Sequence, residues 1–250
     1  MSDTPKNASQ DRILTLDIGG SKIKGTILNA EGDLLQEYAK VDTPDNATPE
    51  RVLEAIKYLV AGFDHYDKIS VGFPGYVKKG IVFTAPNLAT DSWGGVNLNK
   101  LISDALQKPV RIANDADLQG LAVVSGNGLE IVITLGTGFG TAILKDGNLL
   151  PHVELAHHAI TKNKTYDDYV GNEALQQKGR EKWNRRMKKI IDMLKIVFNY
   201  DRLYIGGGNA KELTLDLDTS IELITNKDGI KGGARLWELD ENLFMKTNQG

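Results

Sequence analysis

The chain of 250 residues contains no cysteine. Disulfide bonds, thiolate metal ligands and a cysteine nucleophile are therefore excluded. Long apolar runs are also missing, since no stretch approaches the roughly 20 apolar residues that a helix needs to cross a bilayer. The first residues are polar and lack the apolar core of a signal peptide. We expect a cytoplasmic protein with a disordered leader at residues 1–11 and no membrane partner.

An excess of charge of one sign is missing too. The 30 lysines and arginines nearly balance the 33 aspartates and glutamates, which gives a net charge of -3 and a pI near 5.9. A general nucleic-acid binder is usually basic overall, so nucleic acid is not an expected partner. With 41% hydrophobic and 25% charged residues, the composition is that of a globular protein, which excludes wholesale disorder.

Glycine, by contrast, is abundant, with 26 residues that gather in clusters after apolar runs. The pattern predicts a buried strand at 13–18, a glycine turn and a return strand at 24–28. The same succession returns about half a chain later, with strands predicted at 131–135 and 141–144. A repeat of this length favours two similarly built lobes over a solenoid, whose periods are far shorter.

Strands that alternate with helices predict an α/β fold. We place its two lobes at 12–113 and 114–240, with a cleft between them and the last helix packing back on the first lobe. One helix is expected to start at Thr48, whose side chain would cap it, with Pro49 as its first residue. A long helix is predicted over 183–198, where apolar residues recur at helical spacing.

Three glycine turns follow predicted strands, and glycine lets backbone N–H groups approach an anion closely. A single such turn is as readily explained by hairpin geometry, whereas three together favour phosphate binding. Neither the Walker P-loop motif nor the dinucleotide-binding G-x-G-x-x-G motif is present. The three turns are Gly19-Gly20-Ser21, Gly136-Thr137-Gly138 and Gly206-Gly207-Gly208.

Asp17 ends the first predicted strand, directly before the first glycine turn. A carboxylate beside a phosphate cradle is repelled unless a cation lies between them. Mg²⁺ is therefore the expected cofactor, with Asp17 as its ligand. The alternative is that Asp17 only forms an Asx-type turn.

A group of polar residues follows the strand predicted at 110–113, where the cleft is expected. Asp115 could accept the proton of a substrate hydroxyl as a general base, while Asn114 binds the substrate. Asp117 is the better candidate for the cap of the following helix. The sequence therefore predicts an acid–base centre at the boundary between the lobes.

Glu154 and His157 lie three residues apart and would share one face of a helical turn. The pair could form part of a metal site or a polar clamp. The chain has only four histidines and no cysteine, so binding of sugar hydroxyls fits the pair better than zinc.

Three motifs resemble the ROK sugar kinases of the actin/hexokinase-like ATPase superfamily, namely LDIGGSKIKG (16–25), NDAD (114–117) and LGTGFG (135–140). Further segments are similar to the polyphosphate glucokinase branch of that family, namely TPDNATP (43–49), GFPG (72–75) with TAPNL (84–88), and YIGGGNAK (204–211). The resemblance runs from about Arg12 to Trp237. It implies a duplicated ribonuclease-H-like fold, the actin-like ATPase fold, with an interlobe cleft.

The activity that the resemblance implies is transfer of a phosphoryl group from polyphosphate, ATP or both to the 6-hydroxyl of glucose or a similar hexose. Two alternatives are a strictly ATP-dependent hexokinase for another sugar and a catalytically weak sugar-sensing protein. The implied partners are the small-molecule sugar and the phosphoryl donor, and a homodimer is expected by analogy.

The resemblance also implies roles for individual residues. Asp115 would take the proton from the sugar 6-hydroxyl, and Asp17 would position Mg²⁺. Contacts with the sugar are implied for Asn87, Asn114, Glu154 and His157. Contacts with the donor phosphates are implied for Gly19, Gly20, Ser21, Lys22, Lys24, Thr137, Gly138, Gly207 and Gly208.

The chain departs from the family pattern in places. Zinc-bearing members carry a cysteine cluster after the histidine, and its absence here predicts a protein without zinc. The polyphosphate branch usually reads Pro-Asn-Thr-Glu-Leu-Gly-His where residues 151–157 read PHVELAH, with His152 and Ala156 among the differences, so the sugar is left open. Lys22 matches the general ROK pattern and Lys24 the polyphosphate pattern, which leaves the donor open.

Five basic residues continue at helical spacing beside the apolar face of the long helix. A linear polyanion needs positive charges along a track, whereas ATP needs a purine pocket and a local clamp. The track therefore favours polyphosphate, and the alternative is an ordinary solvated helix face. Its members are Lys178, Lys182, Arg185, Arg186 and Lys189.

Overall fold

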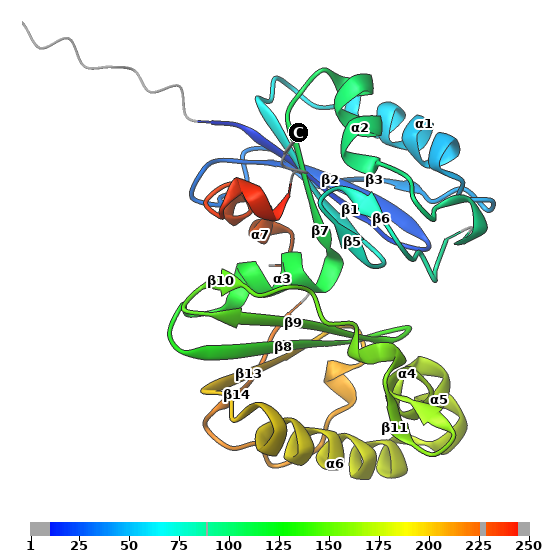
Figure 1. Cartoon of the computed structure of the whole chain (residues 1–250), viewed down its shortest axis with the longest axis vertical. Coiled ribbons are helices and arrows are strands. Elements are labelled where there is room, and N and C mark those ends of the chain that lie inside the picture. The colour runs from blue at the N-terminus through cyan, green and yellow to red at the C-terminus, as the bar shows by residue number, and fades with distance from the viewer. Residues whose placement is uncertain (1–10, 89, 226–228, 245–250) are drawn as a thin grey trace, which may run out of the picture.

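The computed structural model describes residues 11–88, 90–225 and 229–244. The predicted leader at 1–11 therefore lies, except for Asp11, outside the described residues. Two five-stranded sheets lie one above the other, with helices α3 and α7 between them and further helices on the outer face of each sheet (Figure 1). The predicted α/β class is confirmed.

The first sheet has the strand order β3-β2-β1-β4-β7. Strand β2 runs antiparallel to β1 and β3, whereas β1, β4 and β7 run parallel to one another. The central strand β1 is buried along almost its whole length, as expected for a strand that helices cover on both faces. The strands are β1 (Ile13–Ile18), β2 (Lys22–Leu28), β3 (Ala39–Asp42), β4 (Lys68–Phe73) and β7 (Val110–Asn114).

The second sheet repeats this arrangement with the order β10-β9-β8-β13-β14. Strand β9 runs antiparallel to β8 and β10, and β8, β13 and β14 run parallel. The same order and the same directions recur in both sheets, which confirms the predicted duplication. The strands are β8 (Leu129–Leu135), β9 (Phe139–Lys145), β10 (Asn148–Leu149), β13 (Arg202–Gly206) and β14 (Ile221–Leu223).

Helices α1 (Pro49–Val60) and α2 (Leu98–Leu106) cover the outer face of the first sheet. The start of α1 confirms the prediction, because Thr48 is its N-cap and accepts a hydrogen bond from the backbone N–H of Arg51 at 3.5 Å. Its apolar face packs with strands β1 and β4 into one hydrophobic core. Helix α3 (Asp115–Val123) follows β7 directly and lies between the sheets (Figure 1).

Helix α6 (Arg180–Phe198) covers the outer face of the second sheet. The predicted apolar face is confirmed over most of its length, with Trp183 and Met187 fully buried, but Val197 is 66% exposed. The helix begins only after Gly179, whose φ of +74° ends the preceding helix α5 (Asn172–Lys178). The continuous helical track predicted from Lys178 onward is therefore wrong, because the helix breaks after that residue.

The chain returns to the first sheet after β14. The backbone carbonyl of Gly233, in helix α7 (Gly232–Arg235), accepts a hydrogen bond from the Ser70 hydroxyl at 2.6 Å. Arg111 donates from Nη1 to the carbonyl of Leu236 at 2.6 Å, and its guanidinium lies over the rings of Trp237 and Phe244. Residues more than 120 positions apart in the sequence are thus joined in one buried cluster.

The remaining elements are short. Hairpin β5 (Val77–Lys78) and β6 (Ile81–Val82) belongs to the first half, and β11 (Ala159–Thr161), β12 (Lys164–Thr165) and α4 (Tyr166–Val170) belong to the second. The described residues also form short 3₁₀ helices, namely η1 (Thr90–Ser92), η2 (Leu155–His157), η3 (Ala210–Glu212), η4 (Gly229–Lys231) and η5 (Glu241–Leu243). In the described part of the chain, no helix combines the length and the apolarity that a membrane span requires.

Candidate active site

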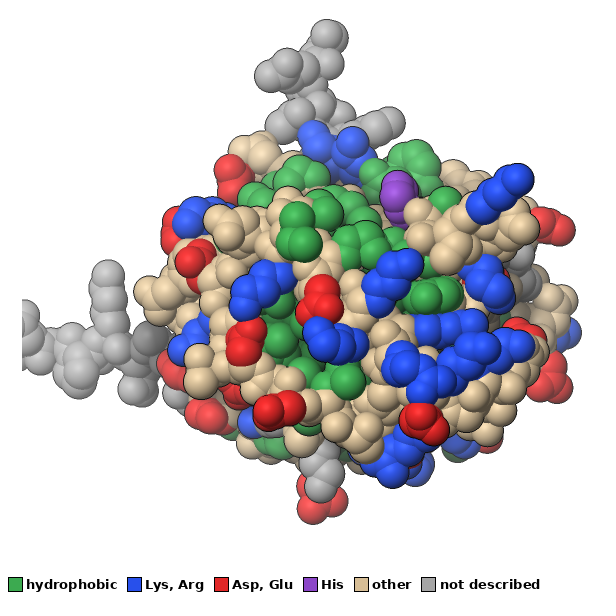
Figure 2. Space-filling view, turned by 90° about the horizontal axis from the view of Figure 1, so that it is seen from below, with side chains coloured by type: hydrophobic (Ala, Val, Ile, Leu, Met, Phe, Trp, Pro, Cys, Tyr) green, Lys and Arg blue, Asp and Glu red, His purple; other side chains and the backbone are tan. Residues whose placement is uncertain are grey.

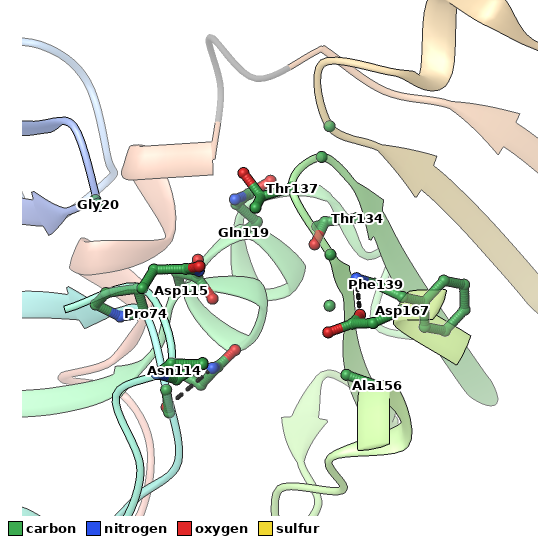
Figure 3. Close-up of a pocket in the computed structure, with 18 of the residues that line it drawn as sticks. Gly20, Pro74, Asn114, Asp115, Gln119, Thr134, Thr137, Phe139, Ala156 and Asp167 are labelled. Atoms are coloured by element: carbon green, nitrogen blue, oxygen red, sulfur yellow. Dashed lines mark hydrogen bonds between the residues drawn. The ribbon is translucent and has the colours of Figure 1, made fainter. Parts of the chain in front are cut away.

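A cleft of about 380 Å³ lies where the two sheets face each other. Figure 3 shows Asn114, Asp115 and Pro74 on one side, with Thr134, Asp167 and Ala156 across the cleft from them. The walls come from the ends of β1, β4 and β7 in the first half of the chain, and from the β8–β9 turn and the segment after β13 in the second. The carboxyl ends of parallel strands are the usual place for ligands in such sheets.

All three predicted glycine turns reach this cleft. Its lining includes Gly19 and Gly20 from the first turn, Thr137 and Gly138 from the second, and Gly207 and Gly208 from the third, with Gly136 and Gly140 beside them. Ser21 belongs to the first turn but does not line the cleft. The third turn is joined to the second by Asn209, which follows Gly208 and whose side chain donates to the carbonyl of Gly136 at 3.1 Å.

Gly207 is the turn residue whose geometry most clearly requires glycine. Its φ is +89°, a conformation that side-chain-bearing residues rarely adopt. A Cβ atom at this position would lie 2.2 Å from the carbonyl oxygen of Leu135. The close approach brings the third turn against the end of β8, so that backbone groups from both turns face one cavity.

Asp17 and Lys24 face each other across the first hairpin. They are register partners in β1 and β2, and Lys24 Nζ lies 3.4 Å from Asp17 Oδ2. Burial raises the pKa of Asp17, and the charge of Lys24 opposes that rise. Lys24 lines the cleft, whereas Lys22 pairs with Asp42 across β2 and β3 and does not line it.

Asp115 is the first residue of α3 and lines the cleft. Its Oδ1 accepts a hydrogen bond from the backbone N–H of Ala116 at 2.8 Å. Burial, followed by the negative charge of Asp17, raises the pKa of Asp115 to about 7, with smaller contributions from Asp117 and Glu154. A carboxylate with this pKa is suited to accept a proton near neutral pH.

Asn114, not Asp117, caps helix α3, which corrects the sequence prediction for the cap. The Asn114 Oδ1 accepts from the backbone N–H of Ala116 at 2.8 Å, and its Nδ2 donates to the carbonyl of Gly75 at 3.0 Å. Asn114 lines the cleft as predicted, but its amide already holds α3 against the loop after β4. Asp117 instead contacts His152, with 3.0 Å between Oδ2 and Nδ1.

Glu154, Ala156 and His157 line the cleft on the side of the second sheet. Glu154 precedes the short helix η2, and His157 ends it, so the predicted helical turn is present as a 3₁₀ turn. Asn87 lines the cleft on the opposite side, next to Gly20, where a Cβ would lie 3.1 Å from the Asn87 carbonyl oxygen. The four residues predicted to bind sugar therefore share one cavity with Asp115.

Sequence reasoning missed Asp167 and Gln119, which also line the cleft. The Asp167 Oδ1 accepts from the backbone N–H of Phe139 at 2.7 Å, so this carboxylate anchors the β8–β9 turn from 28 residues away. Burial raises the pKa of Asp167, and the hydrogen bond from Phe139 opposes that rise. Nothing in the local sequence marks such a contact, since it depends on the packing of α4 against the turn.

The basic residues of the predicted track divide between two helices. Lys178 ends α5, whereas Lys182, Arg185, Arg186 and Lys189 lie on α6, where Arg185 pairs with Glu181 on the same helix. Figure 2 shows basic side chains gathered on one side of the face that carries α6. Lys178 and Arg186 line a second hollow of about 190 Å³ together with Lys164, which sequence reasoning missed, and Thr137 lines both this hollow and the cleft.

Within the described residues, no group of three or more histidine and acidic side chains is placed to hold a metal ion by itself. Magnesium in phosphoryl-transfer sites is usually held by one or two carboxylates together with phosphate oxygens and water. Asp17 supplies a carboxylate beside the first glycine turn, where phosphate is expected. The donor set therefore fits a magnesium ion that arrives with a phosphate donor.

Comparison with known proteins identifies relatives over most of the chain. The sequence model of the ROK family matches residues 13–164. The polyphosphate glucokinase of Mycobacterium leprae is 35% identical over 244 residues, which cover 90% of this chain and 71% of the relative. The polyphosphate glucokinase of Mycobacterium tuberculosis is 31% identical over 236 residues, with 90% of this chain and 87% of the relative covered.

Solved structures of sugar kinases are also similar to this chain. An inorganic polyphosphate/ATP-glucomannokinase from Arthrobacter sp. superposes with a TM-score of 0.81 and 32% identity, over 90% of this chain and 98% of that one. A ROK family glucokinase from Streptomyces griseus superposes with a TM-score of 0.75 at 21% identity, over 90% and 98% of the two chains, and shows the common fold.

Proposed function

The chain belongs to the ROK family, and from this premise we propose that it is a kinase that transfers a phosphoryl group to the 6-hydroxyl of glucose. The observation that carries the proposal is the meeting of Asp115 with three glycine turns in one cleft. The names of the relatives described above, polyphosphate glucokinase and polyphosphate/ATP-glucomannokinase, support glucose as acceptor and polyphosphate or ATP as donor.

In the proposed reaction, the Asp115 carboxylate accepts the proton of the 6-hydroxyl as the oxygen attacks the terminal phosphorus. The bond between that phosphorus and its bridging oxygen breaks, and the donor leaves shortened by one phosphate. The pKa near 7 leaves a large share of Asp115 ionised at neutral pH, so the base is ready before the sugar arrives. Glu154, His157, Asn114 and Asn87 hold the sugar hydroxyls in this proposal.

Positioning and electrostatics supply most of the catalysis, because the transition state of phosphoryl transfer is loose. The backbone N–H groups of the glycine turns and the ammonium group of Lys24 would hold the donor phosphates. Asp17 would hold Mg²⁺, which when bound neutralises charge on the transferred phosphoryl group. Ser21 and Lys22 are less suited to a phosphate contact, since neither lines the cleft.

We further propose polyphosphate as the principal donor. Thr137 and Asp167 line both the cleft and the second hollow, which also contains Asp168 and Glu173. A linear chain of phosphates could continue from the cleft along the basic residues of this hollow, Lys164, Lys178 and Arg186. Arg186 is held in place by a hydrogen bond to the Tyr169 carbonyl at 2.8 Å and by stacking on the Tyr169 ring. Lys24, the lysine that matches the polyphosphate pattern, is also the one in the cleft.

A glucose phosphorylation assay with ATP and with long-chain polyphosphate, run side by side, tests both proposals. We expect turnover with polyphosphate and a rise in its KM in the double variant Lys164→Gln and Lys178→Gln. Loss of each partly screened ion contact should raise the KM for polyphosphate by about twofold to fivefold, and the rise should be smaller at high salt.

Lys57→Gln on the outer helix α1 is the matched control, because Lys57 is an exposed lysine paired with Glu54, remote from the cleft lining. The KM for glucose should be unchanged in every lysine variant. If the double variant and the control have the same KM for polyphosphate, the proposed phosphate path is wrong. If ATP supports turnover and polyphosphate does not, the proposal of polyphosphate as donor is wrong.

Three further expectations stay predictions. The division into lobes at 12–113 and 114–240 is supported by the two sheets, which lie on either side of that boundary. A homodimer is tested by light scattering on the purified protein. A cytoplasmic location is tested by fractionation of cells that express it.

A further inference from the structure

His152 lies in the loop between β10 and η2, with only 6% of its side chain exposed. Its two ring nitrogens face two different carboxylates. Nδ1 lies 3.0 Å from Asp117 Oδ2, and Nε2 lies 3.4 Å from Glu154 Oε2. The ring also stacks on Tyr76, with 5.8 Å between the ring centroids and 20° between the planes.

This geometry favours a charged imidazole when Asp117 and Glu154 are ionised. A neutral imidazole donates from one nitrogen only, whereas here both nitrogens face oxygens that only accept when ionised. Burial by itself lowers the pKa of His152, but the hydrogen bonds to Asp117 and Glu154 and their charges outweigh burial and raise the pKa to about 10. Lys78 and Lys79 line a small cavity together with His152 and Asp117, and Asp115 lines the cleft.

The two carboxylates belong to different parts of the site. Glu154 lines the cleft with 27% of its side chain exposed, where the proposed function places the sugar. Asp117 lies in the first turn of α3, two residues after Asp115. Tyr76 comes from the loop after β4, so His152 contacts groups from both halves of the chain.

We propose that His152 is a positioning residue whose imidazolium fixes the Glu154 carboxylate toward the sugar and ties it to helix α3 beside Asp115. The proposal rests on the proposed glucose kinase function. Without the imidazolium, the buried carboxylate of Asp117 and the partly exposed carboxylate of Glu154 would have no cation between them, and Glu154 would turn away from its place in the cleft.

The test is a double-mutant cycle of His152→Asn and Glu154→Gln, read by glucose binding in a calorimeter without donor. A residue that acts only through Glu154 has no further effect once Glu154 is neutral, whereas a residue that only supports the fold gives additive losses. We expect His152→Asn to weaken glucose binding by about tenfold to a hundredfold, as misplacement of a binding group does. The added effect in the Glu154→Gln background should be below about twofold.

His65→Asn is the matched control, because His65 pairs with Asp67 at 2.9 Å on the surface with 68% of its side chain exposed. Glucose binding by the control should equal that of the wild type. Full additivity in the cycle, or glucose binding by His152→Asn equal to that of the control, overturns the proposal.

A second measurement separates this inference from the proposed function. The ¹⁵N shifts of the His152 ring at pH 8 should report two protonated nitrogens in the wild-type protein, and one in the Asp117→Asn variant. A neutral ring at pH 8 in the wild type overturns the proposal whatever the enzyme does with glucose. A wild type with a charged ring that does not phosphorylate glucose would refute the proposed function alone.

Discussion

The pKa of Asp115 makes the pH dependence of turnover a direct test of its role as general base. Burial and the negative charge of Asp17 disfavour the ionised carboxylate and raise the pKa to about 7, where a free aspartate has 3.8. A general base acts only when it is ionised, so activity is lost as the pH falls through this value. An aspartate of ordinary pKa would give no such loss near neutral pH.

The magnitude follows from the titration of a single group. With a pKa of about 7, the ionised fraction of Asp115 is about one tenth at pH 6, one half at pH 7 and nine tenths at pH 8. The kcat/KM for glucose, which reports the free enzyme, should therefore rise by about tenfold between pH 6 and pH 8. The ordinary pKa of 3.8 predicts less than about 2% change over the same range.

The assay combines this profile with the Asp115→Asn variant. The amide cannot accept the proton, so turnover should fall by about 10²-fold to 10⁴-fold while glucose binding in a calorimeter is retained. Asp104→Asn on α2 is the control, since Asp104 is an exposed acid that pairs with Lys100. A profile that is flat from pH 6 to pH 8, or an Asp115→Asn variant with turnover close to that of the control, would refute the reasoning.

Two predictions concern the frame that holds the site. Gly207→Ala would place a Cβ 2.2 Å from the Leu135 carbonyl oxygen at a φ of +89°, so we expect thermal unfolding to begin at least about 6 °C lower. At Gly208, where an added Cβ meets nothing within 4 Å, the alanine variant should unfold as the wild type does, and equal effects at both positions would contradict the argument. Glu130 is fully buried and accepts from the Tyr204 hydroxyl at 2.9 Å and from two backbone N–H groups at 2.8 Å. Replacing one of its oxygens by an amide in Glu130→Gln should cost about 2–4 kcal/mol in urea unfolding, and an unchanged midpoint would contradict this.

The elements that sequence reasoning predicted well are those with a strong local signal. Strand β1 is a largely apolar run, interrupted by Thr15 and Asp17, because helices cover both of its faces, and a similar run followed by glycine marks β8. The start of α1 is set by Thr48 and Pro49, which act through neighbours in the chain. Such signals need no tertiary contact, so a single sequence is enough to read them.

Features that depend on tertiary contacts were not predicted from the sequence. Asp117 is a good capping residue by composition, yet Asn114 takes the cap because the strand ends one residue later than expected and β7 runs to Asn114 itself. In the sequence, His152 is only a difference from the family pattern with no assigned role. Its contact with Asp117, 35 residues away, becomes visible only in the folded structure. Asp167 is found only once α4 packs on the β8–β9 turn.

The helix break at Gly179 decides which basic residues lie together, and this matters more for the proposed donor site than how many basic residues there are. An unbroken helix would have placed Lys178 in line with Lys182 and Arg186 along one face. The positive φ of Gly179 instead turns α5 toward the β8–β9 turn, so that Lys178 and Arg186 line one hollow with Lys164 from β12. A track laid along one helix could bind a polyanion anywhere on its surface, whereas this hollow shares Thr137 with the cleft.

The net charge of -3 says little about the donor for the same reason, because a ligand responds to charges within about 8 Å at physiological ionic strength. The acids Asp115, Glu154 and Asp167 line the cleft, where a neutral sugar can share the space without repulsion. Lys164, Lys178 and Arg186 line the neighbouring hollow, where a chain of phosphates would enter the proposed path, together with the acids Asp167, Asp168 and Glu173. A polyanion bound there would bring only its terminal phosphate, together with Mg²⁺, up to the acids. Binding of a polyanion along the proposed path would therefore depend on where these individual basic side chains lie, and not on the net charge of the protein or of the hollow.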